Sequence, residues 1–168
     1  MVLLDSQPNQ AFTRLPDYPG FYSAYHRIVA LLPSLARLGV FRLAHQLDFG
    51  TLPAQTRDAE RATQSTGSLA RVQRDEIAEL PTTLNQAAAF TGIGNRPLIV
   101  VTAAKEAQVG WLPLQDEMAG YSSNSVHRVL PNTNHAELID EKSGAAQAGQ
   151  AILDVVESVR NDGRLAKS

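Results

Sequence analysis

Three short stretches rich in apolar residues stand out along the chain, and each has the pattern of a buried β-strand. They cover residues 2–4 (Val-Leu-Leu), 97–102 (Pro-Leu-Ile-Val-Val-Thr) and 126–130 (Val-His-Arg-Val-Leu). The first two are uninterrupted, as expected for parallel strands that are covered on both faces. Polar or turn-forming residues follow each stretch, so all of these strands are expected to be short.

The segments between and after these stretches have helical spacing. Apolar residues recur at steps of three and four between residues 21 and 38, which predicts one or two helices, bent or broken near Pro33 and stopped by Gly39. The composition of residues 51–66 predicts a mobile linker or a weak surface helix. A firmer helix is expected over residues 68–80, with or without a continuation past Pro81 to Phe90. Further helices are expected over residues 112–121 and 148–159, the last with Asp140 or Ser143 as its cap. This alternation favours a single α/β domain with parallel strands.

Composition excludes several classes of function. Hydrophobic residues make up 43% of the chain, enough for a core, and the net charge of -2 includes no block of like charge that would attract nucleic acid or a membrane surface. The sequence has no cysteine, and no two of its histidines have the spacing of a metal site. With no signal peptide and no apolar stretch near the ~20 residues of a membrane span, a soluble, cytoplasmic protein is expected.

The order of these elements resembles the C-terminal half of an α/β-hydrolase of the esterase or lipase type. Residues 2–8 (Val-Leu-Leu-Asp-Ser-Gln-Pro) are similar to the strand after the nucleophile helix, and residues 97–102 resemble the next strand. Residues 111–115 are similar to the helix that follows, and Asn134-His135 resembles the catalytic-histidine loop. The resemblance implies a partial α/β-hydrolase fold of about three parallel strands spanning residues 1–168, with residues 9–90 as a helical lid. It implies no cofactor.

His135 is the candidate catalytic base that the resemblance implies. It follows a turn-rich segment between a short strand and a long helix; the other interpretation is a loop histidine that caps this helix or hydrogen-bonds in a turn. In the family, a carboxylate holds the histidine in the correct tautomer. Asp5, one step beyond an apolar strand, is the preferred acid, and Glu106 is the alternative; Asp5 could instead cap the turn that follows it. The remaining histidines, His26, His45 and His127, are expected on the surface, in the lid or paired with a neighbour.

The nucleophile of such a site is missing from the sequence. No G-x-S-x-G pattern occurs, and Ser6 lacks the glycine-flanked turn that exposes a nucleophile. We therefore expect the C-terminal portion of a serine hydrolase for ester-like small molecules, inactive without an N-terminal half. The alternative is a non-catalytic binding or assembly module derived from a hydrolase. In that case an uncovered sheet edge would pair with a second copy or with an N-terminal half-chain.

Overall fold

The computed structural model describes residues 1–44, 53–64 and 66–165, and in them helices alternate with three strands. In chain order the elements are β1 (Val2–Leu4), α1 (Ala11–Arg14), α2 (Tyr18–Arg37), α3 (Val40–Ala44), α4 (Ala54–Gln64), α5 (Gly67–Ala87), β2 (Leu98–Ala103), α6 (Trp111–Ala119), β3 (Ser125–Leu130), α7 (Glu137–Asp140) and α8 (Lys142–Arg160). The chain is thus an α/β protein. None of the helices described is both long and apolar enough to cross a bilayer.

The three strands form one parallel sheet in the order β1-β2-β3. Val2 pairs with Ile99, and Ile99 in turn pairs with Val126. Every residue of β2 is buried, because the strand has a neighbour on each side and helices over both faces. The uninterrupted apolar sequence of this strand is the reason that it could be located from the sequence.

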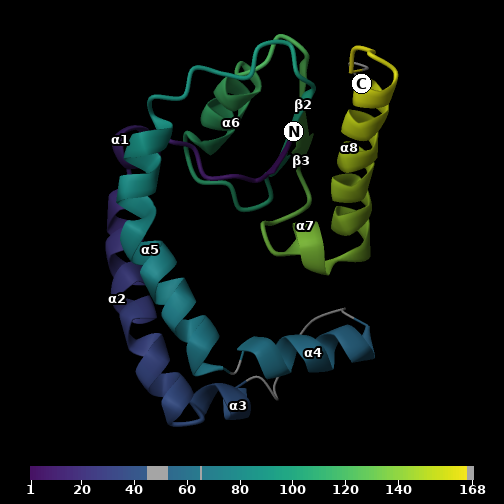
Figure 1. Cartoon of the computed structure of the whole chain (residues 1–168). Coiled ribbons are helices and arrows are strands. Elements are labelled where there is room, and N and C mark those ends of the chain that lie inside the picture. The colour runs from purple at the N-terminus through teal and green to yellow at the C-terminus, as the bar shows by residue number, and fades with distance from the viewer. Residues whose placement is uncertain (45–52, 65, 166–168) are drawn as a thin grey trace. The chain divides into compact units, whose positions relative to one another are not determined.

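Helices cover both faces of the sheet (Figure 1). On one face, Ile99, Val101 and Val126 pack with Leu138 of α7 and with the apolar face of α8, which includes Ala151 and Val155. On the other face, the alternate residues of β2, Leu98 and Val100, pack with Met118 and Ala119 of α6. These layers, with residues 1–16 and 87–168, make one compact unit of the chain.

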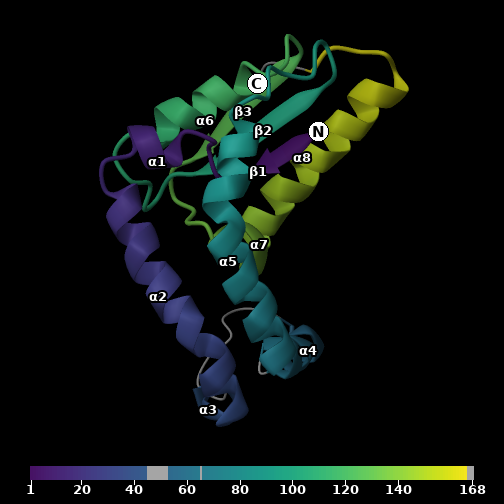
Figure 2. The same cartoon turned by 60° about the vertical axis from the view of Figure 1, so that its left-hand side comes forward.

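Asp17 to Gln86 form a second compact unit, which contains α2, α3, α4 and most of α5. Within it α2 and α5 run side by side (Figures 1 and 2), and the Tyr22 hydroxyl donates a hydrogen bond to the Ile77 carbonyl at 2.9 Å. This unit falls inside the segment of residues 9–90 that the sequence assigns to a helical insertion.

Three of the expectations for the helices have an outcome in the structure. Helix α2 continues through Pro33 without a break, although an interior proline removes one helical hydrogen bond. Of the two alternatives for residues 51–66, the helix is found, as α4. The expected cap of α8 by Asp140 or Ser143 was wrong: Asp140 belongs to α7, and Glu141, in an extended conformation, is the only residue between the two helices. His45 lies outside the described residues.

Candidate functional site

Asp5 lies immediately after β1 and is nearly buried, with 7% of its surface exposed. Its carboxylate oxygen Oδ1 accepts hydrogen bonds from Trp111 Nε1 at 3.0 Å and from the Ala103 backbone N–H at 3.3 Å. Its backbone has a φ of 42°, in the left-handed region that non-glycine residues seldom adopt. Two donors and an uncommon backbone conformation therefore fix the direction of this carboxylate.

The second carboxylate oxygen of Asp5 contacts His135. The distance between Asp5 Oδ2 and His135 Nδ1 is 2.8 Å. Because an ionised carboxylate can only accept a hydrogen bond, Nδ1 is the donor, and a neutral imidazole then has its lone pair on Nε2. The His135 side chain is 75% exposed, and no described residue forms a hydrogen bond with Nε2. The site thus presents a basic nitrogen to solvent on an imidazole that a buried carboxylate orients.

The backbone around His135 is held by a reciprocal pair of hydrogen bonds. Asn134 Oδ1 accepts from the Glu137 N–H, and Glu137 Oε2 accepts from the Asn134 N–H, both at 2.9 Å. This is a capping box at the start of α7. Lys105 Nζ donates to Glu137 Oε1 at 2.7 Å; this bond, together with the Asn134 N–H, lowers the pKa of Glu137, and Glu137 raises the pKa of Lys105. The side chain that accepts from the first N–H of α7 is therefore that of Asn134, and not that of His135.

All these groups meet because the strands are parallel. Asp5 follows β1, Ala103 ends β2, and the His135 loop follows β3, so each lies at the carboxyl end of its strand. In open α/β sheets this edge is the usual place for ligand sites.

Two other residues considered from the sequence, Glu106 and Ser6, form no hydrogen bond with His135 through their side chains among the described contacts. Glu106 is exposed in the loop after β2 and has no hydrogen bond to His135 among the described contacts. Ser6 is half-buried, and it is the Ser6 backbone carbonyl that is engaged, as the acceptor of a 2.6 Å bond from Gln115 Nε2. Of the two acids considered, Asp5 is the one that contacts His135 among the described residues.

A second histidine, on β3, has a different environment. His127, on β3, has its Nε2 2.8 Å from the Thr102 hydroxyl and its Nδ1 3.2 Å from Asp116 Oδ1. It pairs with its neighbours, which is one of the roles that the sequence allowed. His26, the remaining described histidine, is half-buried on α2 with its ring centroid 5.8 Å from that of Tyr22.

Sequence reasoning missed the residues that support the site. Trp111 and Gln115 are far from Asp5 along the chain, and no local pattern connects them to it. The capping box, by contrast, is visible in the sequence: Asn134 and Glu137 have the spacing of its two members. Reading that pattern would have located the start of α7 and the held loop around His135.

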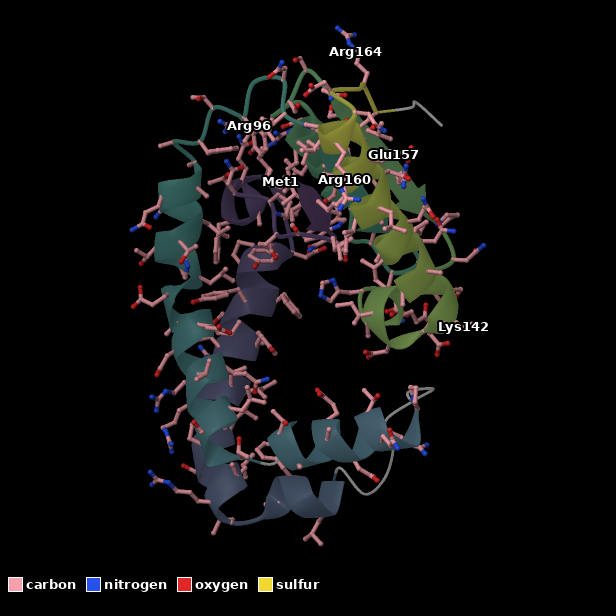
Figure 3. All side chains as sticks on the ribbon, turned by 45° about the vertical axis from the view of Figure 1, so that its right-hand side comes forward. Met1, Arg96, Lys142, Glu157, Arg160 and Arg164 are labelled. Atoms are coloured by element: carbon pink, nitrogen blue, oxygen red, sulfur yellow. The ribbon has the colours of Figure 1, made fainter. Side chains whose placement is uncertain are left out.

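The cavity beside the C-terminal end of α8 is not part of this site. A cavity of about 490 Å³ is lined by Arg128 of β3, by the C-terminal end of α8 and by the segment after it. There the Leu165 N–H bonds to Asn124, just before β3, which places the cavity toward the amino ends of the strands. In Figure 3, Glu157 and Arg164 mark this region, and Arg164 points away from the rest of the unit. The described residues contain no cluster of side chains suited to a metal ion.

Comparison with known proteins does not supply a family. Neither the protein-family models, nor the curated proteins, nor the solved structures contain a match to this chain. The geometry of the site and the resemblance of the sequence are therefore the observations that bear on function.

Proposed function

We propose that this chain supplies the general base and its orienting acid to an α/β-hydrolase that acts on ester-like small molecules. The observation that supports this most directly is the 2.8 Å contact between the buried Asp5 carboxylate and Nδ1 of the exposed His135. In the proposed reaction Nε2 of His135 takes the proton of a serine hydroxyl and returns it to the leaving group. Asp5 holds the tautomer and stabilises the imidazolium that forms.

In this proposal the nucleophile and the oxyanion donors belong to polypeptide outside these 168 residues, since the sequence has no nucleophile turn. The arrangement of elements supports the assignment. A helical segment separates β1 from β2, in the position of a lid, and the candidate acid and base follow parallel strands of one sheet. In this proposal residues 9–90 form the lid of the enzyme.

The first test compares the chain alone with a complete enzyme. Residues 1–168 should hydrolyse p-nitrophenyl butyrate no faster than the His135→Ala variant does, and a fluorophosphonate probe should not label them. The same chain fused behind the nucleophile-bearing half of an α/β-hydrolase should gain activity that His135→Ala abolishes. Stoichiometric labelling of the chain alone, or activity of the fusion that survives His135→Ala, would contradict the proposal.

A second candidate function, a binding or assembly module, is favoured by the free edge of β1. The Met1 carbonyl accepts from the Ile99 N–H, and the Asp5 N–H donates to Val101. Successive residues of a strand point their backbone groups to opposite sides, so those of Val2 and Leu4 face away from β2, where the described sheet has no further strand. An edge of this kind invites pairing with another chain.

The two functions predict different behaviour in solution. As an assembly module, the chain should form a stable homodimer, and light scattering should give the dimer mass across a tenfold range of concentration. Leu4→Pro should dissociate this dimer, because proline removes a backbone donor that faces the free edge. A matched Ile152→Ala change on the outer face of α8 should leave the dimer intact. A monomer mass throughout would rule out the homodimer.

A further inference from the structure

Helix α6 contacts the turn formed by Asp5 and Ser6 at two points. Trp111 Nε1 donates to the Asp5 side chain at 3.0 Å, and Gln115 Nε2 donates to the Ser6 carbonyl at 2.6 Å. Trp111 and Gln115 are four residues apart in the helix, so they lie on the same helical face. One face of α6 therefore binds both the carboxylate and the backbone of the turn.

Gln115 is itself fixed from behind. It is fully buried, and its Oε1 accepts a long hydrogen bond of 3.4 Å from the hydroxyl of Thr102, which is also buried. A buried amide that lost its partners would incur a free-energy cost, so Gln115 has little freedom to turn away from Ser6. The helix, β2 and the turn are connected through this one side chain.

The turn needs such support because its backbone conformation is unfavourable. Asp5 has a φ of 42°, and a non-glycine residue in this region persists where its surroundings hold it. If the contacts from α6 were lost, the turn could relax to a negative φ, which would redirect the carboxylate. The direction of Asp5 Oδ2 decides whether it reaches His135 Nδ1.

We propose that Trp111 and Gln115 are positioning residues, which hold the Asp5–Ser6 turn so that Asp5 keeps His135 in the Nδ1–H tautomer. This inference rests on the proposed function for its catalytic meaning. Its physical content, the tautomer of His135, can be measured on the 168-residue chain alone. Neither residue touches the reacting nitrogen, Nε2.

The test is long-range ¹H–¹⁵N NMR of the His135 ring in the full chain, at a pH where the ring is neutral. The wild type should be mainly the Nδ1–H tautomer. Trp111→Phe and Gln115→Met should each lower the ratio of Nδ1–H to Nε2–H by roughly fivefold, the equivalent of one hydrogen bond of about 1 kcal/mol. Asp5→Asn removes the carboxylate itself, so its change in the tautomer ratio is the largest that is expected. Glu117→Gln, on the same helix but paired with Arg14, is the matched control and should change nothing.

An unchanged tautomer ratio in both Trp111→Phe and Gln115→Met, with a changed ratio in Asp5→Asn, would overturn the proposal. If either α6 variant fails to fold, as judged by circular dichroism, the reciprocal experiment decides. Asp5→Ala removes the acceptor of Trp111, so the indole N–H should exchange with solvent at least about tenfold faster than in the wild type. Unaltered indole exchange would overturn the positioning role.

These outcomes are separable from the proposed function. A fusion enzyme that shows no activity, in a chain whose tautomer responds as expected, would reject the hydrolase assignment and leave the positioning role intact. An active fusion in which the Trp111 and Gln115 variants leave the tautomer ratio of His135 unchanged would support the hydrolase assignment and reject the positioning role.

Discussion

Two of the histidines that the structure describes lie beside carboxylates, and the two pairs are opposite in burial. In the first pair, the side chain of Asp5 is 7% exposed and that of His135 is 75% exposed. In the second, Asp116 is 77% exposed and His127 is 12% exposed. The residue types are the same, and each contact is through Nδ1, at 2.8 Å in the first pair and 3.2 Å in the second.

The difference in burial determines what each histidine can do. Nε2 of His127 is already engaged by the Thr102 hydroxyl, whereas Nε2 of His135 has no partner among the described residues. A buried carboxylate with two further donors orients its histidine firmly, while an exposed one is screened by water and free to turn. A histidine and an aspartate in contact therefore do not define a site; the histidine must also have its second nitrogen free.

The largest expected effect concerns the two acids, measured in the complete fusion enzyme. Asp5→Asn should lower kcat by roughly 10³- to 10⁴-fold, because asparagine tolerates the left-handed backbone but leaves the imidazole in the wrong tautomer. Asp116→Asn should change kcat by less than about threefold, since its partner is not the proposed base. Steady-state kinetics on p-nitrophenyl butyrate measures both.

Glu106→Gln is the control for the alternative acid and should also cost little. A large loss at Glu106 with a small loss at Asp5 would move the acid to the loop after β2. If neither change matters while His135→Ala abolishes activity, the acid comes from another part of the enzyme.

The next largest effect concerns stability, because the two histidines lie on different elements of the structure. His127 lies within β3, whereas the His135 loop leads into α7, which packs on α8 at Gly144. A methyl group at Gly144 would overlap the Glu137 carbonyl oxygen, so Gly144→Ala should lower the free energy of unfolding by about 1–3 kcal/mol. Urea denaturation measures this loss.

Gly149→Ala is the matched control on the same helix. Its added methyl would meet no atom within 4 Å, so this change should be neutral or stabilise the protein by up to about 1 kcal/mol. Hydrogen exchange should show faster opening around His135 than in β3 for Gly144→Ala. Equal effects of the two alanines would contradict the close packing of α7 on α8.

A pH effect is expected in the loop that carries His135, through Glu137. The pKa of Glu137 is lowered, mainly by its hydrogen bond from Lys105 and then by that from Asn134. Its interactions therefore stabilise the loop fully above the ordinary carboxyl pKa of about 4.3 and are lost as the pH falls through the lower folded-state pKa. The protection factor of the Asn134 amide should drop in that acidic range, as measured by NMR hydrogen exchange.

The Glu137→Gln variant provides the control for this pH effect. Glutamine can serve in a capping box but does not titrate, so the protection of Asn134 should become independent of pH in that range. The amides of β3 should keep their protection in both proteins. If Glu137→Gln retains the pH dependence, a different carboxyl group is responsible.

The fold could be predicted from the sequence where burial on both faces leaves an uninterrupted apolar pattern. This holds for β1 and β2 and for the buried face of α8, and the parallel α/β class follows from their order. The cap of α8 could not be predicted, because α7 extends to Asp140 and packs closely against Gly144 of α8, which is a feature of tertiary packing. Local preferences for a capping residue are weaker than that contact.

The two residues of the candidate site that follow strands could be predicted, because the ends of the strands could be located in the sequence. Asp5 and His135 each follow a strand, and parallel strands bring their carboxyl ends together. Trp111 and Gln115 could not be found in this way, because their contacts with the turn join residues more than a hundred positions apart. The sequence likewise contains nothing that predicts the left-handed backbone of Asp5, since aspartate only tolerates it.

The smallest expected effect tests whether the exposed pair matters for stability at all. Asp116→Asn should change the free energy of unfolding by less than about 0.5 kcal/mol, because an exposed carboxylate interacts weakly and asparagine can still hydrogen-bond. His127 should remain in place, since its Nε2 keeps the Thr102 hydroxyl as a partner at 2.8 Å. Thr102→Val should cost more, because it removes that partner from a mostly buried ring. Urea denaturation of both variants, with the His127 ring followed by NMR, measures the difference. Two results would contradict this expectation: a loss of more than about 1 kcal/mol in the free energy of unfolding for Asp116→Asn, or a smaller loss for Thr102→Val than for Asp116→Asn. Either would mean that the exposed carboxylate holds its histidine as firmly as the buried one does.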